Sequence, residues 1–224
     1  MAARKKLHFL ITAGGTREYI DPVRYISNAS SGRTGYALAE AALKKGYRVT
    51  LISAPTNLSR PKGAKLVPVV SAAQMSASVK KHFKKCDCLI MAAAVSDYTP
   101  AQKAKVKRKK AKGILTLRLK PTEDILAWAG KNKTHQFVVG FALEDSGLKK
   151  NAERKMLSKN ADMIIANTPA AIGRRTSELL IKTPATDWLT INSAKTISAA
   201  RVIRLICRLR RCNPSALSVC AYNA

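Results

Sequence analysis

The residues from Ile11 to Gly35 combine more chemically useful groups than any other part of the chain. The segment reads ITAGGTREYIDPVRYISNASSGRTG, with two glycine clusters, several arginines and the amide of Asn28. A connection between a strand and a helix usually takes two to six residues, whereas this one takes roughly twenty. Its length and composition predict a binding site.

The end of this segment, from Ser30 to Gly35, lies where an amphipathic helix is expected to begin. Free backbone N–H groups and the positive end of the helix dipole favour a phosphate group there. Gly32 and Gly35 would let that phosphate approach the backbone. The pattern is not GxGxxG, so dinucleotide binding is only weakly indicated, and a glycine-lined packing turn is the alternative.

Two later segments add groups that suit an anionic ligand. In AAAVSDYTP, small residues such as Ala93 and Ala94 allow close approach, and Asp97 is placed either to accept ligand hydrogen bonds or to cap a turn. Lys105 and Lys107 offer mobile positive charge for a triphosphate. Protection of an edge strand explains these two lysines equally well.

Several familiar catalytic patterns are absent from the sequence. There is no GxSxG, HExxH or Walker loop, and no convincing pair of catalytic carboxylates. An enzyme without its own nucleophile can use a group of the substrate instead. This favours nucleotidyl or phosphoryl transfer, in which the protein positions the reactants and neutralises charge.

The elements that must position these groups follow from the apolar pattern. It predicts strands at Leu7–Thr12, Tyr47–Ser53, Lys65–Val70, Cys88–Ala92, Gln136–Ala142 and Asp162–Ala166. Helices are predicted at Thr34–Lys45, ending at Gly46, at 72–83 after the cap Ser71, at 122–130, ending at Gly130, and at Leu148–Lys159. This alternation predicts an α/β fold, a Rossmann-like three-layer sandwich with a mostly parallel sheet. The loops 13–35, 92–103, 142–147 and 167–176 should then emerge on one side.

A β-hairpin is expected to project from this sheet. Lys105–Arg108 and Ile114–Lys120 read as its two strands, joined around Lys-Gly. Leu115, Leu117 and Leu119 alternate with polar residues and give it one apolar face. A two-stranded hairpin is marginal alone, so this face should pack on the same subunit or on another.

The composition fits a soluble globular chain of 224 residues, 46% hydrophobic and 24% charged. No apolar run is long enough to span a membrane, and LHFLIT after MAARKK reads as a first strand rather than a signal peptide. We therefore expect a cytoplasmic protein. The five cysteines show no CxxC spacing and the three histidines are scattered, so we expect reduced thiols and no protein-held metal.

The net charge of +28 is unusual. Seven positive charges lie within 103–112, and five arginines load the segment 201–211. Such an excess attracts polyanions such as nucleic acid, anionic membranes or anionic substrates, although a solvated surface is its commonest meaning.

Five segments together resemble phosphopantothenoylcysteine synthetase, the ligase that joins 4′-phosphopantothenate to L-cysteine in coenzyme A synthesis. They are ITAGGTREYIDPVRYISNASSGRTGYALAEAALKKG, MAAAVSDY, KVKR, VVGFALED and ADMIIANT, in the family's order and spacing. The resemblance covers roughly 7–206, which predicts one ligase domain at 1–206 and an irregular basic tail at 207–224. It implies that CTP activates the carboxylate as an acyl cytidylate, with Mg²⁺ accompanying the triphosphate. It also implies a homodimer and, since no flavin-dependent decarboxylase domain precedes Leu7, a separate decarboxylase.

The resemblance also implies roles for individual residues. Asn28 corresponds to the asparagine that contacts the pantothenate moiety and stabilises the acyl-nucleotide intermediate, and Lys105 to a lysine that reaches the phosphates. Arg24 corresponds to an arginine that reaches the substrate phosphate in the neighbouring subunit. Ala93, Ala94 and Asp97 match positions around the pantothenoyl arm and nucleotide. The remaining nucleotide contacts implied are Gly14, Ser30, Gly32, Gly35, Phe141, Lys155, Lys159 and Asn167.

Three departures from the family pattern stand out. The usual KxKK reads KVKR, and the usual NPDI reads PTEDI, which keeps Asp124 and Ile125. The segment AIGRRTSELL replaces a Phe-x-Ser-Asp loop after Asn167, and the tail beyond Ile206 matches nothing in the family. The sequence does not decide between CTP and ATP.

Two other function classes compete with the ligase. A nucleic-acid-binding protein would use the +28 charge, but only 5% of residues are aromatic, too few for base-stacking platforms. We therefore expect nucleic acid to bind only non-specifically. A nicotinamide-dependent reductase would need GxGxxG and an acidic ribose-binding residue after the second strand, where SAPTN stands instead.

Overall fold

The computed structural model describes residues 6–110, 112–168 and 176–210. Its strands are β1 (His8–Ala13), β2 (Arg17–Tyr19), β3 (Tyr25–Ser27), β4 (Arg48–Ser53), β5 (Lys65–Pro68), β6 (Cys88–Met91), β7 (Tyr98–Pro100), β8 (Leu119–Pro121), β9 (Phe137–Leu143), β10 (Met163–Asn167), β11 (Thr176–Thr183) and β12 (Thr186–Ala194). Its helices are α1 (Arg33–Lys44), α2 (Ala72–Phe83), α3 (Ile125–Asn132), α4 (Leu148–Ser158) and α5 (Lys195–Leu209). No helix of the described residues is long and apolar enough to cross a membrane.

The core of the fold is an eight-stranded sheet in the order β12-β11-β10-β9-β6-β1-β4-β5. The six strands from β10 to β5 are parallel, and they are the six that the apolar pattern predicts, with ends shifted by at most two residues. The antiparallel strands β11 and β12 extend the sheet and were not predicted. The available sequence signal for these strands is the two-residue spacing of Leu179 and Ile181 and of Leu189 and Ile191, which puts each pair on one face of its strand.

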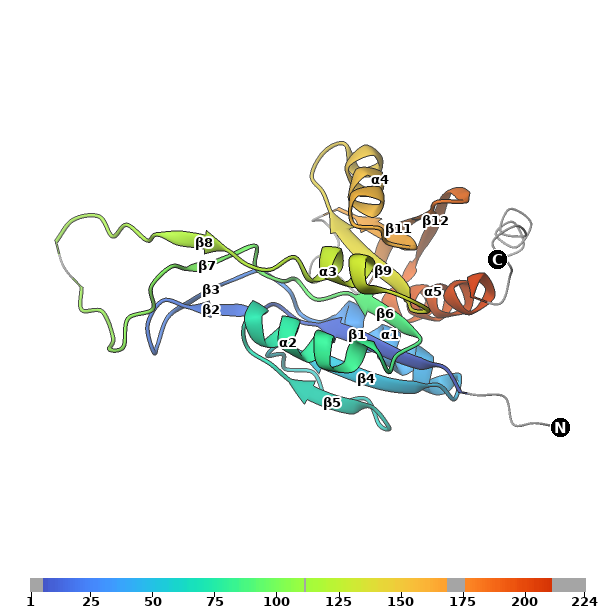
Figure 1. The fold of residues 1–224 in the computed structure, drawn as a ribbon, viewed down its shortest axis with the longest axis horizontal. Coiled ribbons are helices and arrows are strands. Elements are labelled where there is room, and N and C mark those ends of the chain that lie inside the picture. The colour runs from blue at the N-terminus through green and yellow to red at the C-terminus, as the bar shows by residue number, and fades with distance from the viewer. Residues whose placement is uncertain (1–5, 111, 169–175, 211–224) are drawn as a thin grey trace.

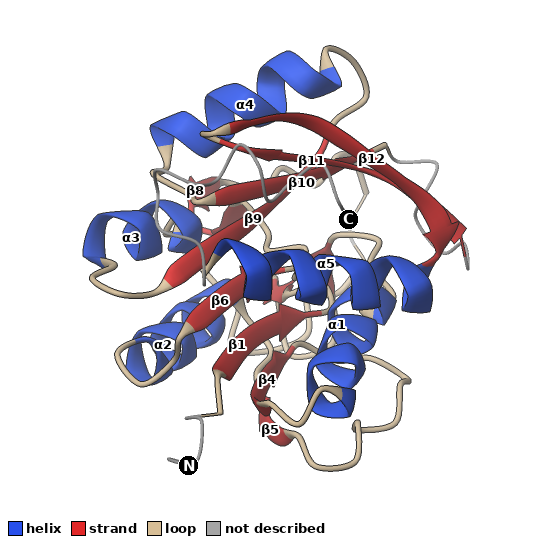
Figure 2. Ribbon diagram, turned by 90° about the vertical axis from the view of Figure 1, so that its right-hand side faces the viewer, coloured by secondary structure: helices blue, strands red, loops and turns tan. Residues whose placement is uncertain are grey.

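Helices cover both faces of this sheet, as predicted for a three-layer sandwich (Figure 2). The side chains of α1 and α5 pack over one face with Phe9 and Ile11, and the side chains of α2, α3 and α4 pack over the other face with Leu10. Neighbouring residues of β1 thus enter opposite cores, because side chains alternate across a strand. All three are fully buried, so β1 is anchored from both sides.

The helix ends agree with the sequence in two cases and differ in two. Gly46 follows α1 with φ 75°, as expected for a C-cap glycine, and Ser71 forms a capping box with Gln74 at the start of α2. Helix α3, by contrast, continues past Gly130 to Asn132. Helix α5 runs to Leu209 with Cys207 buried, so the tail predicted to begin at 207 starts inside a helix, and 211–224 lies outside the described residues.

The projecting hairpin is confirmed, but its predicted strands are wrong. Tyr98–Pro100 pairs with Leu119–Pro121, and 101–118 extends beyond them as a long arm, while Lys105–Arg108 forms no strand (Figure 1). With a turn at Lys112-Gly113, the predicted pairing would put Lys107 opposite Arg118 and Lys105 opposite Lys120, and like charges opposite each other destabilise strand pairing. We call 98–121 the arm.

An ion pair between buried Asp21 and exposed Arg24 ties the arm to the small sheet formed by β2 and β3. Asp21 is fully buried and accepts hydrogen bonds from the backbone N–H groups of Val23 and Arg24, 2.9 and 2.8 Å long. The Arg24 guanidinium donates to Asp21 Oδ2 at 2.6 Å and to the carbonyl of Arg108 at 2.7 Å. The Arg24 guanidinium, with these N–H groups, holds the pKa of Asp21 well below its usual value despite burial.

Gly130 of α3 is where this helix touches the end of α4. A Cβ at Gly130 would collide with the carbonyl oxygen of Lys159, and the Asn160 side chain donates to the Gly130 carbonyl at 2.9 Å. This explains why a glycine that reads as a helix stop lies inside the helix. Its missing side chain permits the contact.

We predict that Gly130→Ala destabilises the protein by about 1–3 kcal/mol, because overpacking against a backbone atom outweighs the ~1 kcal/mol gain in helix propensity. Urea unfolding measures the difference. Lys131→Ala, at the neighbouring exposed position, should stay within about 0.5 kcal/mol of wild type. A Gly130→Ala protein more stable than wild type would contradict this prediction, because it would show that the Lys159 backbone can move aside without loss of stability.

We also predict a pH-dependent effect of Asp21→Asn. Because the folded-state pKa of Asp21 is depressed, its stabilising contribution is present above the ordinary aspartate pKa and is lost as pH falls below it. The variant should be less stable than wild type at pH 7, and this difference should shrink below about pH 4. Urea unfolding from pH 7 to pH 3 measures it. Asp145→Asn, at an exposed position, should show no such trend, and a pH-independent difference for Asp21→Asn would contradict the role of its charge.

Candidate active site

The loops after β1 and β6, with the carboxyl ends of β9 and β10, surround a cavity of about 730 Å³. It opens at the carboxyl ends of the parallel strands, where β1 has β4 on one side and β6 on the other. The chain passes from β1 through α1 on one face to β4, and later through α2 on the other face to β6. Such a reversal of strand order is where open α/β sheets bind their ligands.

The loop after β1 forms the first wall, with residues 28–34 lining the cavity. The Asn28 side chain donates from Nδ2 to the carbonyl of Val95 at 3.1 Å, which holds this wall against the loop after β6. Gly32 precedes α1 with φ 75°, a conformation that favours glycine, so the helix N-terminus opens onto the cavity. The first N–H groups of α1 therefore form a site suited to phosphate.

The loop after β6 forms the second wall and is joined to the first through backbone bonds. Ala94 N–H donates to the Gly14 carbonyl at 2.9 Å, and Thr16 N–H donates to the Ala94 carbonyl at 3.2 Å. The Thr12 and Thr16 hydroxyls accept from the N–H groups of Ala93 and Ser96, 3.1 and 2.9 Å away. Small side chains at 92–94 leave the space beside this backbone open to a ligand.

The third wall is cationic and comes from α3, α4 and β9. Lys155 donates to the Phe141 carbonyl at 2.8 Å, and burial together with the nearby Lys159 ammonium holds its pKa below the usual value. Lys159 forms an ion pair of 2.7 Å with Asp124, which also caps α3 by accepting from Ala127 N–H. Burial alone would raise the pKa of Asp124, but Lys159 and this N–H hold it below its usual value.

Most of the site residues expected from the sequence meet in this cavity. Its lining contains Asn28, Ser30, Gly32, Ala93, Ala94, Asp97, Phe141, Lys155, Lys159 and Asn167. These positions come from five separate segments that the fold alone brings together.

Four expected residues do not line the cavity. Gly14 lies against Ala54 and Thr56, and Gly35 lies against the backbone of β1, so both provide close packing beneath the site. Arg24 is engaged by Asp21 and the Arg108 carbonyl, and Lys105 is exposed on the arm.

The structure adds lining residues that sequence reasoning missed. Arg33 and Thr34 belong to the first turn of α1, and residues 122–126 surround the start of α3. Lys195 enters from the start of α5, and burial, with the nearby Arg33 charge, lowers its pKa. The available sequence signal for residues 122–126 was the pair Thr122 and Asp124, which are typical residues of a helix start.

Comparisons with known proteins match both the sequence and the fold. The family model of the DNA/pantothenate metabolism flavoprotein C-terminal domain matches residues 4–209. The coenzyme A biosynthesis bifunctional protein CoaBC of Bacillus subtilis is 48% identical over 74% of this chain, and that of Escherichia coli K12 is 43% identical over 73%. The chain spans 41% of the length of each of these relatives.

Solved structures give the same result. The crystal structure of the C-terminal domain of a CoaBC protein superposes with a TM-score of 0.77 at 35% identity, over 89% of this chain and 93% of that one. A DNA/pantothenate metabolism flavoprotein from Streptococcus pneumoniae has a TM-score of 0.79 at 23% identity, over 89% and 98% of the two chains, which shows the shared fold. The chain belongs to the family of the DNA/pantothenate metabolism flavoprotein C-terminal domain.

Proposed function

We propose that this chain is a phosphopantothenate–cysteine ligase that acts in coenzyme A biosynthesis. The observation that carries the proposal is the single cavity lined by Asn28, Ala93, Asp97, Phe141 and Lys155, positions expected from the family motifs. The bifunctional CoaBC relatives support the pathway. A more distant protein of the same fold, 20% identical, was solved in complex with phosphopantothenate-cysteine.

The proposed reaction activates a carboxylate before an amide bond forms. A carboxylate oxygen of 4′-phosphopantothenate attacks the α-phosphorus of CTP, and pyrophosphate leaves. The amine of L-cysteine then attacks the acyl carbon, CMP leaves, and the amine loses a proton. Both nucleophiles belong to substrates, so the protein needs to position the reactants and balance their charge.

The geometry supplies these two functions. The N-terminus of α1 offers N–H groups to phosphate oxygens, and Lys155 and Lys195 add positive charge to the walls. The bond from Asn28 to Val95 occupies one N–H of the amide, so its carbonyl oxygen and second N–H suit contacts with the acyl nucleotide. A volume of about 730 Å³ lies within the usual range for small-molecule sites.

The expected Mg²⁺ fits this site as part of the nucleotide complex. Among the described residues, no group of three His, Cys, Asp or Glu side chains is placed to hold a metal. Magnesium bound to a triphosphate keeps phosphate and water ligands and needs few from the protein. When bound, the ion would neutralise phosphate charge. Asp97 is the candidate carboxylate for it, because the other two described carboxylates of the cavity wall, Glu123 and Asp124, already pair with lysines.

We also propose a homodimer that forms through the arm and the β2–β3 sheet. Exposed apolar side chains concentrate there, namely Val23, Tyr25, Tyr98, Val106, Ile114, Leu115 and Leu119. Arg24 is fixed within this surface, and Lys105 lies on the arm rather than in its own cavity, so pairing would carry both toward the partner's site.

We further propose that the protein acts in the cytoplasm, which supplies the nucleotide and reduced cysteine, and that a separate decarboxylase acts on the product.

The first test is a pyrophosphate-release assay with 4′-phosphopantothenate, L-cysteine and either CTP or ATP. We predict release that depends on phosphopantothenate and is faster with CTP. Omitting cysteine should leave at most a single turnover, because the acyl cytidylate then has no acceptor. If neither nucleotide gives substrate-dependent pyrophosphate, the ligase assignment fails.

The second test is Asn28→Asp. The substitution places a negative charge beside two anionic substrates and removes an amide N–H, so kcat should fall at least about 100-fold, the typical cost of losing a transition-state donor. Asn192→Asp, at an exposed position of β12, makes the same chemical change away from the cavity and should keep wild-type turnover. Full activity of the Asn28 variant would remove this residue from the mechanism.

The third test concerns the dimer. Tyr98→Asp combined with Leu119→Asp places charges in the proposed interface and should shift the sedimentation coefficient from dimer to monomer. Leu157→Asp, on exposed α4, should leave the wild-type value. A wild-type protein that sediments as a monomer at micromolar concentration would contradict the proposed dimer.

A further inference from the structure

The end of the sheet opposite the cavity, where the parallel strands begin, carries a dense group of positive charges. Strands β1, β4 and β5 begin there, and α2 ends there. Its exposed cations are Arg48, Lys65, Lys81, Lys84 and Lys85, which we call the basic edge. None of them lines the cavity.

Strand register and hydrogen bonds place these residues together. The Lys85 carbonyl can only accept, so His8 Nδ1 donates to it at 2.9 Å, and His8 Nε2 lies within hydrogen-bond distance of the Thr50 hydroxyl at 2.9 Å. Thr50 pairs with Lys65, and His8 pairs with Arg48. A continuous set of contacts therefore runs from Lys65 through β4 and β1 to the turn after α2.

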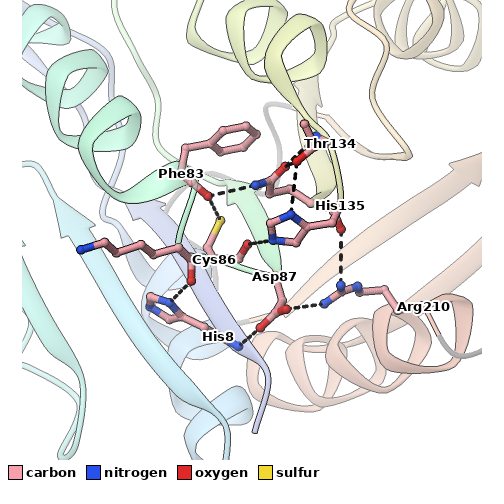
Figure 3. Close-up of polar contacts among 9 residues, drawn as sticks. His8, Phe83, Cys86, Asp87, Thr134, His135 and Arg210 are labelled. Atoms are coloured by element: carbon pink, nitrogen blue, oxygen red, sulfur yellow. Dashed lines mark hydrogen bonds and ion pairs between the residues drawn. The ribbon is translucent and has the colours of Figure 1, made fainter. Parts of the chain in front are cut away.

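This turn is a rigid support for its lysines (Figure 3). The Lys85 N–H donates to the His82 carbonyl at 3.2 Å, and the Cys86 thiol donates to the Phe83 carbonyl at 3.1 Å. From the segment just before β9, the His135 ring donates to the Cys86 carbonyl at 3.2 Å. The backbone is fixed while the lysine side chains extend into solvent.

The nearby carboxylates are engaged in internal bonds. Asp87 accepts from His8 N–H at 2.8 Å and pairs with Arg210 at 3.5 Å, as Figure 3 shows. Asp162 accepts from Val138 N–H and pairs with Lys133. Burial and the charges of Lys65, Lys81, His8 and Lys85 lower the pKa of His82, as expected where positive charges repel one another.

The surroundings of the basic edge identify the class of partner. Protein interfaces usually have an apolar or aromatic centre, but none of the exposed large apolar side chains of the described residues lies between 26 and 97. A phosphate backbone needs only cations and is bound without base contacts. We propose that the basic edge binds the phosphate backbone of nucleic acid independently of base sequence.

The test measures anisotropy of a labelled duplex of about 20 base pairs from roughly 50 to 300 mM KCl. The variant Lys65→Gln/Lys81→Gln/Lys85→Gln removes three charges from the basic edge. The control Lys149→Gln/Lys150→Gln/Arg154→Gln removes three exposed charges from α4. Each phosphate contact contributes about 0.9 to the slope of log K against log salt, so the first variant should lose about 2–3 from this slope.

At about 100 mM KCl, we expect this variant to lose at least ~10-fold in affinity and the control less than ~3-fold. Lysine-to-arginine changes at the same three positions should retain binding, and Lys81→Gln alone should lose about 0.9 from the slope. Pyrophosphate release by the basic-edge variant should match wild type, because none of its residues lines the cavity.

Three results would overturn the proposal. Equal losses in the two triple variants would show attraction by net charge alone. Competition by poly-glutamate as effective as that by DNA of equal total charge would indicate an acidic polypeptide as partner. No binding by wild type at about 50 mM KCl would remove the surface from consideration.

Discussion

The contact between the loops after β1 and β6 is the constraint on which the site depends. These strands are neighbours in the sheet, but the chain between them first builds β4, β5 and α2. Reciprocal bonds join Gly14, Thr16 and Ala94 across the point where the strand order reverses. Because backbone groups make this contact, small side chains can line the cavity while the walls stay fixed. The N-terminus of α1 and the small residues at 92–94 therefore keep a constant separation.

A second set of contacts fixes the cationic wall relative to that frame. Gly130 lets α3 approach the Lys159 backbone, and Asp124 at the other end of the same helix pairs with the Lys159 ammonium. One short helix thus positions both the backbone and the charged end of this lysine. Lys155, one turn earlier, is held by a carbonyl of β9. A partly buried lysine costs free energy, and the anionic substrates of the proposed ligase would restore the interaction that burial removes.

The sequence predicts well the elements that depend on a local residue pattern, and predicts poorly the contacts between segments far apart in the chain. The parallel strands were predictable because their runs are apolar on both faces, and the caps at Ser71 and Gly46 depend on neighbouring residues alone. Gly130 was misread because a close approach between two helices leaves no local signal. The arm strands were misplaced because charge repulsion across a turn overrode the alternation of leucines. Lys195 was missed because only tertiary packing brings α5 to the cavity.

The distribution of charge separates the needs of the site from those of the whole molecule. The cavity contains both signs, and Lys159 is already balanced by Asp124, so the proposed substrates require only a few of the 41 basic residues. With 13 acidic residues in total, ion pairing cannot neutralise the rest. The arm and the basic edge hold much of this excess at opposite ends of the sheet. Self-repulsion of this kind lowers stability, and a bound polyanion would relieve it at the edge, where a rigid turn already holds the lysines together.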